Sequence, residues 1–123
     1  MPNKTEITKI LAALGNLTRL ALVEQLSMAE TFAGQSISEL AESSGITRQA
    51  VTKHLEVLAE AGLVSRLKPG RATWYELKVE PLKAAIEALT SVANQHQRSQ
   101  QRLKKFAREV KNGAGLLSGR KKA

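Results

Sequence analysis

Cysteine and aspartate do not occur in this sequence, and aromatic residues make up only 3% of it. Without cysteine the chain can form no disulfide, respond to no oxidant through a thiol and hold no metal through thiolates. Because aromatic residues are so few, a core has to be built from Leu, Ile, Val and Ala. This composition favours packed helices.

Long apolar runs are also missing. No stretch approaches the roughly 20 apolar residues that a membrane-spanning helix needs. The first ten residues, MPNKTEITKI, lack the apolar region of a signal peptide. We therefore expect a cytoplasmic protein. Its 123 residues fit one compact domain, which we expect at 1–110, before a basic, disordered tail at 111–123.

The net charge of +8 is unevenly distributed. Residues 1–80 contain nine Lys and Arg and nine Glu, whereas residues 81–123 contain ten Lys and Arg and two Glu. The total charge therefore does not by itself indicate a nucleic-acid surface in the first 80 residues. Local charge is more informative, because 45–55 and 65–75 contain cations and no acid.

Apolar periodicity and capping residues predict a mainly α fold with a small β-hairpin. Helices are expected at 4–14, after a cap at Asn16, from Ser36 to Gly45, at 47–61 and, opened by Pro81, at 81–110; strands are expected at 63–67 and 72–77. The side chains expected in the core include Leu17, Leu20 and Leu26 of the second helix, Val51, Leu55 and Leu58 of the fourth, and Tyr75 of the second strand.

Residues 36–61 have the pattern of a helix-turn-helix. Polar side chains open its second helix, away from the apolar stripe, and the hairpin tip KPGR adds two cations behind it. The major groove of DNA admits a helix whose first residues reach base edges, where Arg can pair with guanine and Gln with adenine. A solvated helix face is the plain alternative, but the cationic hairpin favours DNA. The candidate contacts are Thr47, Arg48, Gln49, Thr52, Lys53, His54, Lys68 and Arg71.

Motifs for catalysis are absent. The sequence has no nucleophile elbow, no HExxH and no phosphate-binding glycine loop, so we predict no enzyme activity and no cofactor. His54 is expected to pack or contact a phosphate, and His96 to set helix register, rather than to bind metal. Arg19 is expected to form a structural pair with a glutamate rather than to reach DNA.

The last expected helix carries a row of positions spaced alternately by four and three residues. This 3.5-residue repeat is typical of helices that pair along their length. We call the row the seam: Leu82, Ile86, Leu89, Ala93, His96, Gln100, Leu103, Ala107 and Val110.

Three stretches resemble the ArsR-type (ArsR/SmtB) winged helix-turn-helix repressors: LAALGNLTRLALVEQL, SISELAESSGITRQAVTKHLEVLAEAGLVSRLKPGRATWYEL and PLKAAIEAL. They cover most of residues 7–90. The resemblance implies a homodimeric repressor on a pseudo-palindromic operator, read by the helix at 47–61 and the wing at 68–71. It also implies a dimer interface from the first and last helices, for which the candidates are Ile7, Ile10, Leu11, Leu82, Ile86, Leu89, Ala93 and Leu103.

The sequence departs from the metal-sensing members of that family. One family site uses cysteines of the helix-turn-helix, and another uses Asp and His with His and Glu of the last helix. This chain has no Cys, no Asp and one His in its last helix, so it resembles the subgroup without these ligands. An inducer, whether a small molecule or a protein, is left open. The alternative is a winged helix used for protein contacts, with the basic 98–122 segment as a tether to an acidic partner or RNA.

Overall fold

The computed structural model describes residues 2–28, 34–67 and 73–113. The chain divides into two compact units, Met1–Glu87 and Ala88–Ala123, and the division falls inside the last helix. The predicted hairpin tip at 68–71 and most of the predicted tail lie outside the described residues.

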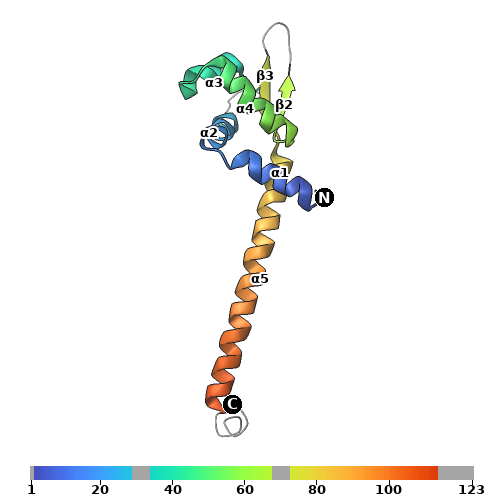
Figure 1. The fold of residues 1–123 in the computed structure, drawn as a ribbon, viewed down its shortest axis with the longest axis vertical. Helices are drawn as coiled ribbons and strands as arrows, with labels where there is room; N and C mark the ends of the chain where they lie inside the picture. Colours follow the sequence, from blue (N-terminus) through green and yellow to red (C-terminus); the bar gives the residue numbers. More distant parts are fainter. Residues whose placement is uncertain (1, 29–33, 68–72, 114–123) are drawn as a thin grey trace. The chain divides into compact units, whose positions relative to one another are not determined.

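Four helices, a hairpin and a fifth helix follow one another as the sequence predicts (Figure 1). The first helix has the predicted bounds, and the last extends two residues beyond its predicted end. The helices are α1 (Lys4–Leu14), α2 (Leu17–Ser27), α3 (Ile37–Ser44), α4 (Arg48–Glu60) and α5 (Val79–Asn112), and the strands are β1 (Gln35–Ser36), β2 (Val64–Leu67) and β3 (Trp74–Leu77).

Capping residues set the starts of the helices, as predicted. The side chain of Asn16 accepts a hydrogen bond from the Arg19 amide at the start of α2. At α3, Ser36 and Glu39 each accept from the other's backbone amide, which completes a capping box. The Thr47 hydroxyl accepts from the Ala50 amide at the start of α4. These bonds satisfy amides that a helix leaves without intrahelical partners.

The sheet contains one strand more than the sequence predicts. Its antiparallel order is β1-β3-β2, with Ser36 opposite Trp74 on one side of β3 and Leu67 opposite Trp74 on the other. Ser36 is therefore both the end of β1 and the cap of α3. The amide of Ile37 also donates to the Thr73 carbonyl at 3.4 Å, so the start of α3 is tied to the start of β3.

The core of the first unit is aliphatic, as the composition predicts, and the buried stripe of α4 and the buried Tyr75 are confirmed. The predictions for Leu17 and Leu20 were wrong, because these side chains are 87% and 44% exposed. Helix periodicity explains the error: once Leu26 faces inward, Leu17 falls about 180° and Leu20 about 120° from it around α2. The largest fully buried side chains are Leu22, Leu40, Val51, Leu55, Leu58 and Leu63.

Helix α5 begins two residues earlier than predicted, at Val79, so Pro81 is its third residue rather than its first. Proline is tolerated there because the first amides of a helix have no intrahelical acceptor. Near this end, Ala85 is buried in the core and Leu82 packs partly against it.

Candidate nucleic-acid interface

Helix α4 is held by one face and exposed on another. Val51, Leu55 and Leu58 are fully buried and fix the helix to the core. The turn before it contains Gly45, whose φ of 73° lies in the left-handed region that glycine adopts readily. Helices α3 and α4 contact each other across this turn, which gives the helix-turn-helix arrangement (Figure 1).

The first two turns of α4 present the predicted polar side chains. Thr47, Arg48, Gln49 and Lys53 are exposed, whereas Thr52 is half-buried. The Thr52 hydroxyl donates to the Arg48 carbonyl at 2.9 Å, so one of its hydrogen-bonding groups is already used inside the helix. The exposed set therefore consists of one threonine cap, two cations and one amide.

A polar hollow of about 290 Å³ lies beside this set. Arg48, Gln49 and Thr52 of α4 line it together with Ser38 of α3 and Thr73, which precedes β3. Sequence reasoning did not predict Ser38 and Thr73 at this site. Their position beside α4 follows from the pairing of β1 with β3, which brings together residues far apart in the sequence, so no local signal could have revealed it.

Arg19 connects the end of α1 to α4. Its Nε donates to the Ala13 carbonyl at 2.7 Å, and its Nη2 lies 3.5 Å from the Ala12 carbonyl oxygen. Its Nη1 lies 3.5 Å from Nδ1 of His54, which is half-buried. The role of Arg19 is structural, as predicted, but its partners here are backbone carbonyls and a histidine instead of a glutamate.

The predicted wing contacts, Lys68 and Arg71, lie outside the described residues. The strands that flank them are described and paired, with Arg66 opposite Tyr75 and Leu67 opposite Trp74. The wing thus begins from a regular antiparallel ladder.

The predicted dimer-interface residues differ in what they expose. Ile10 is only 3% exposed and belongs to the core of its own chain. Ile7, Leu11 and Leu82 are half-buried against that core. On α5, Ile86, Leu89, Ala93 and Leu103 are exposed.

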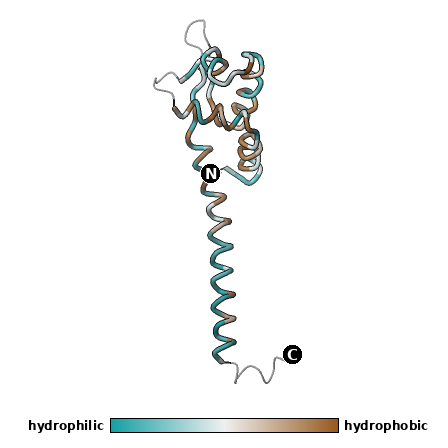
Figure 2. Tube along the Cα trace, turned by 90° about the vertical axis from the view of Figure 1, so that its left-hand side faces the viewer, coloured by the Kyte–Doolittle hydropathy of each residue, from teal (hydrophilic) through white to brown (hydrophobic). Residues whose placement is uncertain are grey.

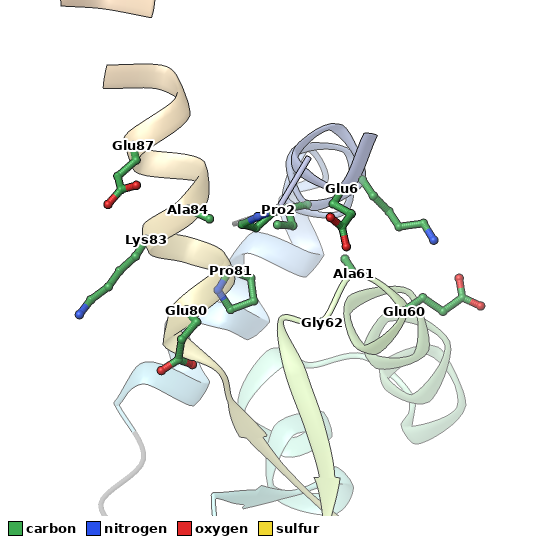
Figure 3. Close-up of a pocket in the computed structure, with 12 residues that line it drawn as sticks. Pro2, Glu6, Glu60, Ala61, Gly62, Glu80, Pro81, Lys83, Ala84 and Glu87 are labelled. Atoms are coloured by element: carbon green, nitrogen blue, oxygen red, sulfur yellow. The ribbon is translucent and has the colours of Figure 1, made fainter. Parts of the chain in front are cut away.

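A second cavity, of about 610 Å³, lies between the start of α1, the end of α4 and the start of α5 (Figure 3). Its lining includes Pro2, Glu80, Pro81, Lys83 and Ala84. Throughout residues 2–28, 34–67 and 73–113, no group of three or more His, Asp or Glu side chains is placed to hold a metal ion. In the same ranges, no helix combines the length and the apolar character that crossing a bilayer requires.

Comparisons with known proteins agree with this geometry. A profile described as a helix-turn-helix domain matches residues 14–66. The chain is 32% identical, over 72% of its length and 72% of the relative's, to a Halobacterium salinarum protein described as an arsenical resistance operon repressor, ArsR2. It is 38% identical to the HTH-type transcriptional regulator YuzN of Bacillus subtilis, over 69% of this chain and 92% of that protein.

Solved structures share the fold. An ArsR-like transcriptional regulator from Rhodococcus sp. RHA1 superposes with a TM-score of 0.73 at 31% identity, covering 84% of this chain and 93% of that one. A domain from Mycobacterium bovis, described as a homodimeric winged helix-turn-helix DNA-binding domain, gives a TM-score of 0.58 at 21% identity, covering 77% and 84%.

The two-helix unit and its paired hairpin define a DNA-binding protein of the winged helix-turn-helix class. The similarity to named relatives is more specific: the chain belongs to the ArsR family of transcriptional regulators. It is therefore a DNA-binding transcriptional regulator, and its family is one of regulators rather than enzymes. Family membership thus supports the DNA-binding function over the alternative of a winged helix used for protein contacts.

Proposed function

We propose that the protein is a homodimeric repressor that binds a pseudo-palindromic operator, with α4 in the major groove and the 68–71 wing on the flanking backbone. The observation that carries this proposal is the exposed polar set at the start of α4, which is held from behind by a fully buried stripe. As a repressor that binds DNA, the protein would act in the cytoplasm. Residues 1–110 would act as one functional domain.

The chemistry of α4 suits base reading at two positions. Arg48 can donate two hydrogen bonds to guanine, and Gln49 can exchange two with adenine. Thr47 already caps the helix, so it supports the position of the N-terminus, where a phosphate is favoured by the helix dipole. Lys53, one turn further on, supplies a phosphate contact.

The seam of α5 supports a dimer. Ile86 is 61% exposed, Leu89 53% and Leu103 63%. They belong to one row of the helix, and an exposed apolar row of this kind marks an interaction site. Because the seam repeats every 3.5 residues, it suits a second copy of the same helix. The similarly folded domain from Mycobacterium bovis is itself described as homodimeric.

The test is the preference for one DNA site. Arg48→Ala and Gln49→Ala should each lower the ratio of the affinity for the operator to the affinity for a random duplex by about 5- to 150-fold. The reason is that a bidentate base contact contributes about 1–3 kcal/mol of discrimination. Anisotropy with duplexes from the region upstream of the gene measures both affinities.

Lys4→Ala is the matched control, because Lys4 is an exposed cation on α1 and not on α4. It should leave the ratio of the two affinities unchanged. If Arg48→Ala and Gln49→Ala also leave this ratio unchanged, α4 does not read the operator.

A further inference from the structure

The distal part of α5 carries a concentration of positive charge. It lies outside α4 and the wing, the two elements proposed to contact the operator. Residues 98–111 contain six Lys and Arg and one acid, Glu109. All six basic side chains are exposed. Figure 2 shows this part of α5 as mostly hydrophilic, with separate hydrophobic positions along it. The cations are Arg98, Arg102, Lys104, Lys105, Arg108 and Lys111.

Helix geometry sorts these cations into two rows. Arg98, Arg102 and Lys105 follow the spacing i, i+4, i+7, and Lys104, Arg108 and Lys111 repeat it. At about 100° per residue, each row lies about 120° from the apolar side that contains Leu103 and Phe106. A helix that pairs through its apolar side therefore keeps both basic rows exposed.

The distribution of charge over the whole chain gives these rows a role. Residues 1–80, which include α4 and the wing, contain equal numbers of basic and acidic residues. The net charge of +8 comes from residues 81–123. Sequence-independent attraction to DNA depends on the phosphates that a protein neutralises. Within residues 1–80 the cations at 45–55 and 65–75 are balanced by glutamates elsewhere, whereas residues 98–111 carry six cations and one acid.

We infer that the two basic rows of α5 bind the phosphate backbone of double-stranded DNA without reading its sequence, and supply most of the protein's salt-dependent affinity. This rests on the proposed function in one respect, since a second copy covers the apolar side. The 14 residues span about 20 Å of helix. A duplex offers about twelve phosphates over that length, enough for all six cations.

Double-stranded DNA fits these rows better than other polyanions do. Proteins that hold single strands stack bases on aromatic side chains. The one aromatic residue of 98–111 is Phe106, and it lies on the apolar side rather than in a basic row. An anionic membrane would take up the apolar side of the helix, which pairing withdraws from lipid.

The experiment removes one basic row at a time from the full chain. One variant carries Arg98→Gln, Arg102→Gln and Lys105→Gln, and the other carries Lys104→Gln, Arg108→Gln and Lys111→Gln. Glutamine keeps a helix-forming side chain and removes the charge. A neutral control replaces Gln95, Gln97 and Gln101 with Ala. Circular dichroism and sedimentation confirm that helix content and dimerisation are unchanged.

Affinity is measured against salt for a random duplex, the operator, a single-stranded RNA of equal length and anionic phosphatidylserine vesicles. Each basic-row variant should lose about a hundredfold in affinity for both duplexes at 0.1 M salt, with a salt slope lower by at least about two, because each lost phosphate contact removes about 0.9 from the slope. The neutral control should match the parent. An unchanged salt slope overturns the inference, and so does a loss confined to RNA or to vesicles.

The two proposals fail separately. If Arg48→Ala and Gln49→Ala abolish site preference while the basic-row variants behave like the parent, only the role of distal α5 is wrong. If the basic-row variants weaken all duplexes while Arg48→Ala and Gln49→Ala leave site preference intact, only the assignment of the reading helix is wrong.

Discussion

At the scale of single residues, Arg19 joins three helices through one guanidinium group. It belongs to α2, donates to the last carbonyls of α1 and approaches His54 of α4. Carbonyls at the end of a helix lack intrahelical donors. A cation there also interacts favourably with the negative end of the helix dipole. Arg19 therefore holds α1, and with it part of the expected dimer surface, beside α4.

Replacing Arg19 with Met should lower the free energy of unfolding by about 1–3 kcal/mol, the typical contribution of a hydrogen bond to a charged group. Methionine keeps most of the aliphatic length and removes the donors. Urea denaturation followed by circular dichroism measures the change. Arg48→Met, at an exposed position of α4, should change stability by less than about 0.5 kcal/mol. A stable Arg19→Met variant with weakened DNA binding would instead assign the guanidinium to DNA.

Residue-scale features were predictable from the sequence where the interaction is local. Asn16, Ser36 and Thr47 cap helices whose amides lie three residues away, so spacing alone reveals them. The partners of Arg19 and the exposure of Leu17 were not predictable in this way. They depend on which side of α2 packs against the rest of the fold. Because α2 has apolar residues on more than one side, its sequence does not show which side is buried.

At the scale of elements, one glycine precedes a strand and another follows a helix, and they are required for different reasons. Gly34, before β1, and Gly45, after α3, both have a positive φ, of 78° and 73°. A side chain on Gly45 would meet no atom within 4 Å, whereas one on Gly34 would collide with the backbone carbonyl of Tyr75 in β3. Only Gly34 is therefore required by packing as well as by backbone conformation.

Gly45→Ala should destabilise the fold by about 1 kcal/mol, the effect of a left-handed conformation on a residue with a Cβ. Gly34→Ala should destabilise it by more than about 2 kcal/mol, because β1 and β3 must also separate. Thermal or urea unfolding of the matched pair measures the difference. Equal losses would contradict the close approach of Gly34 to β3.

Strand β1 shows what element-scale prediction misses. It has two residues and pairs with β3 almost forty positions later, so it has no alternating pattern of its own. The helices were predictable because each has several turns of apolar periodicity and a capping residue. The start of α5 was placed too late because proline is allowed throughout the first turn and not only at its first position.

At the scale of the whole molecule, the seam of α5 predicts a dimer that a charge can break. Leu89→Glu places a carboxylate in the seam of each copy. Dimer dissociation should rise by at least a hundredfold, about 3 kcal/mol, since a buried charge without a partner is strongly unfavourable. Analytical ultracentrifugation over a concentration series measures it. The folded monomer should survive, because Leu89 is already 53% exposed within one chain.

Thr90→Glu adds the same charge next to Leu89 but outside the seam, at an exposed position. It should leave dimerisation intact. If both variants dissociate alike, charge on α5 and not the seam governs assembly; if neither does, the seam is not the interface.

Molecule-scale properties followed from the sequence only where a pattern runs along it. The fold class, the seam and the uneven charge all have this form. The hollow beside α4 does not, because its lining comes from α3, α4 and the residue before β3. The base sequence of the operator could not be predicted from the chain either, because base preference depends on how α4 is oriented in the groove.

One set of α4 side chains packs in the core and, on the proposed function, a different set contacts the bases of the operator. Val51, Leu55 and Leu58 fill the core, and Arg48 and Gln49 contribute nothing to it. Exchanges at the two outer positions thus leave the interior volume untouched. A lineage of such proteins can acquire new target promoters by single codon changes, without first having to repair a damaged scaffold.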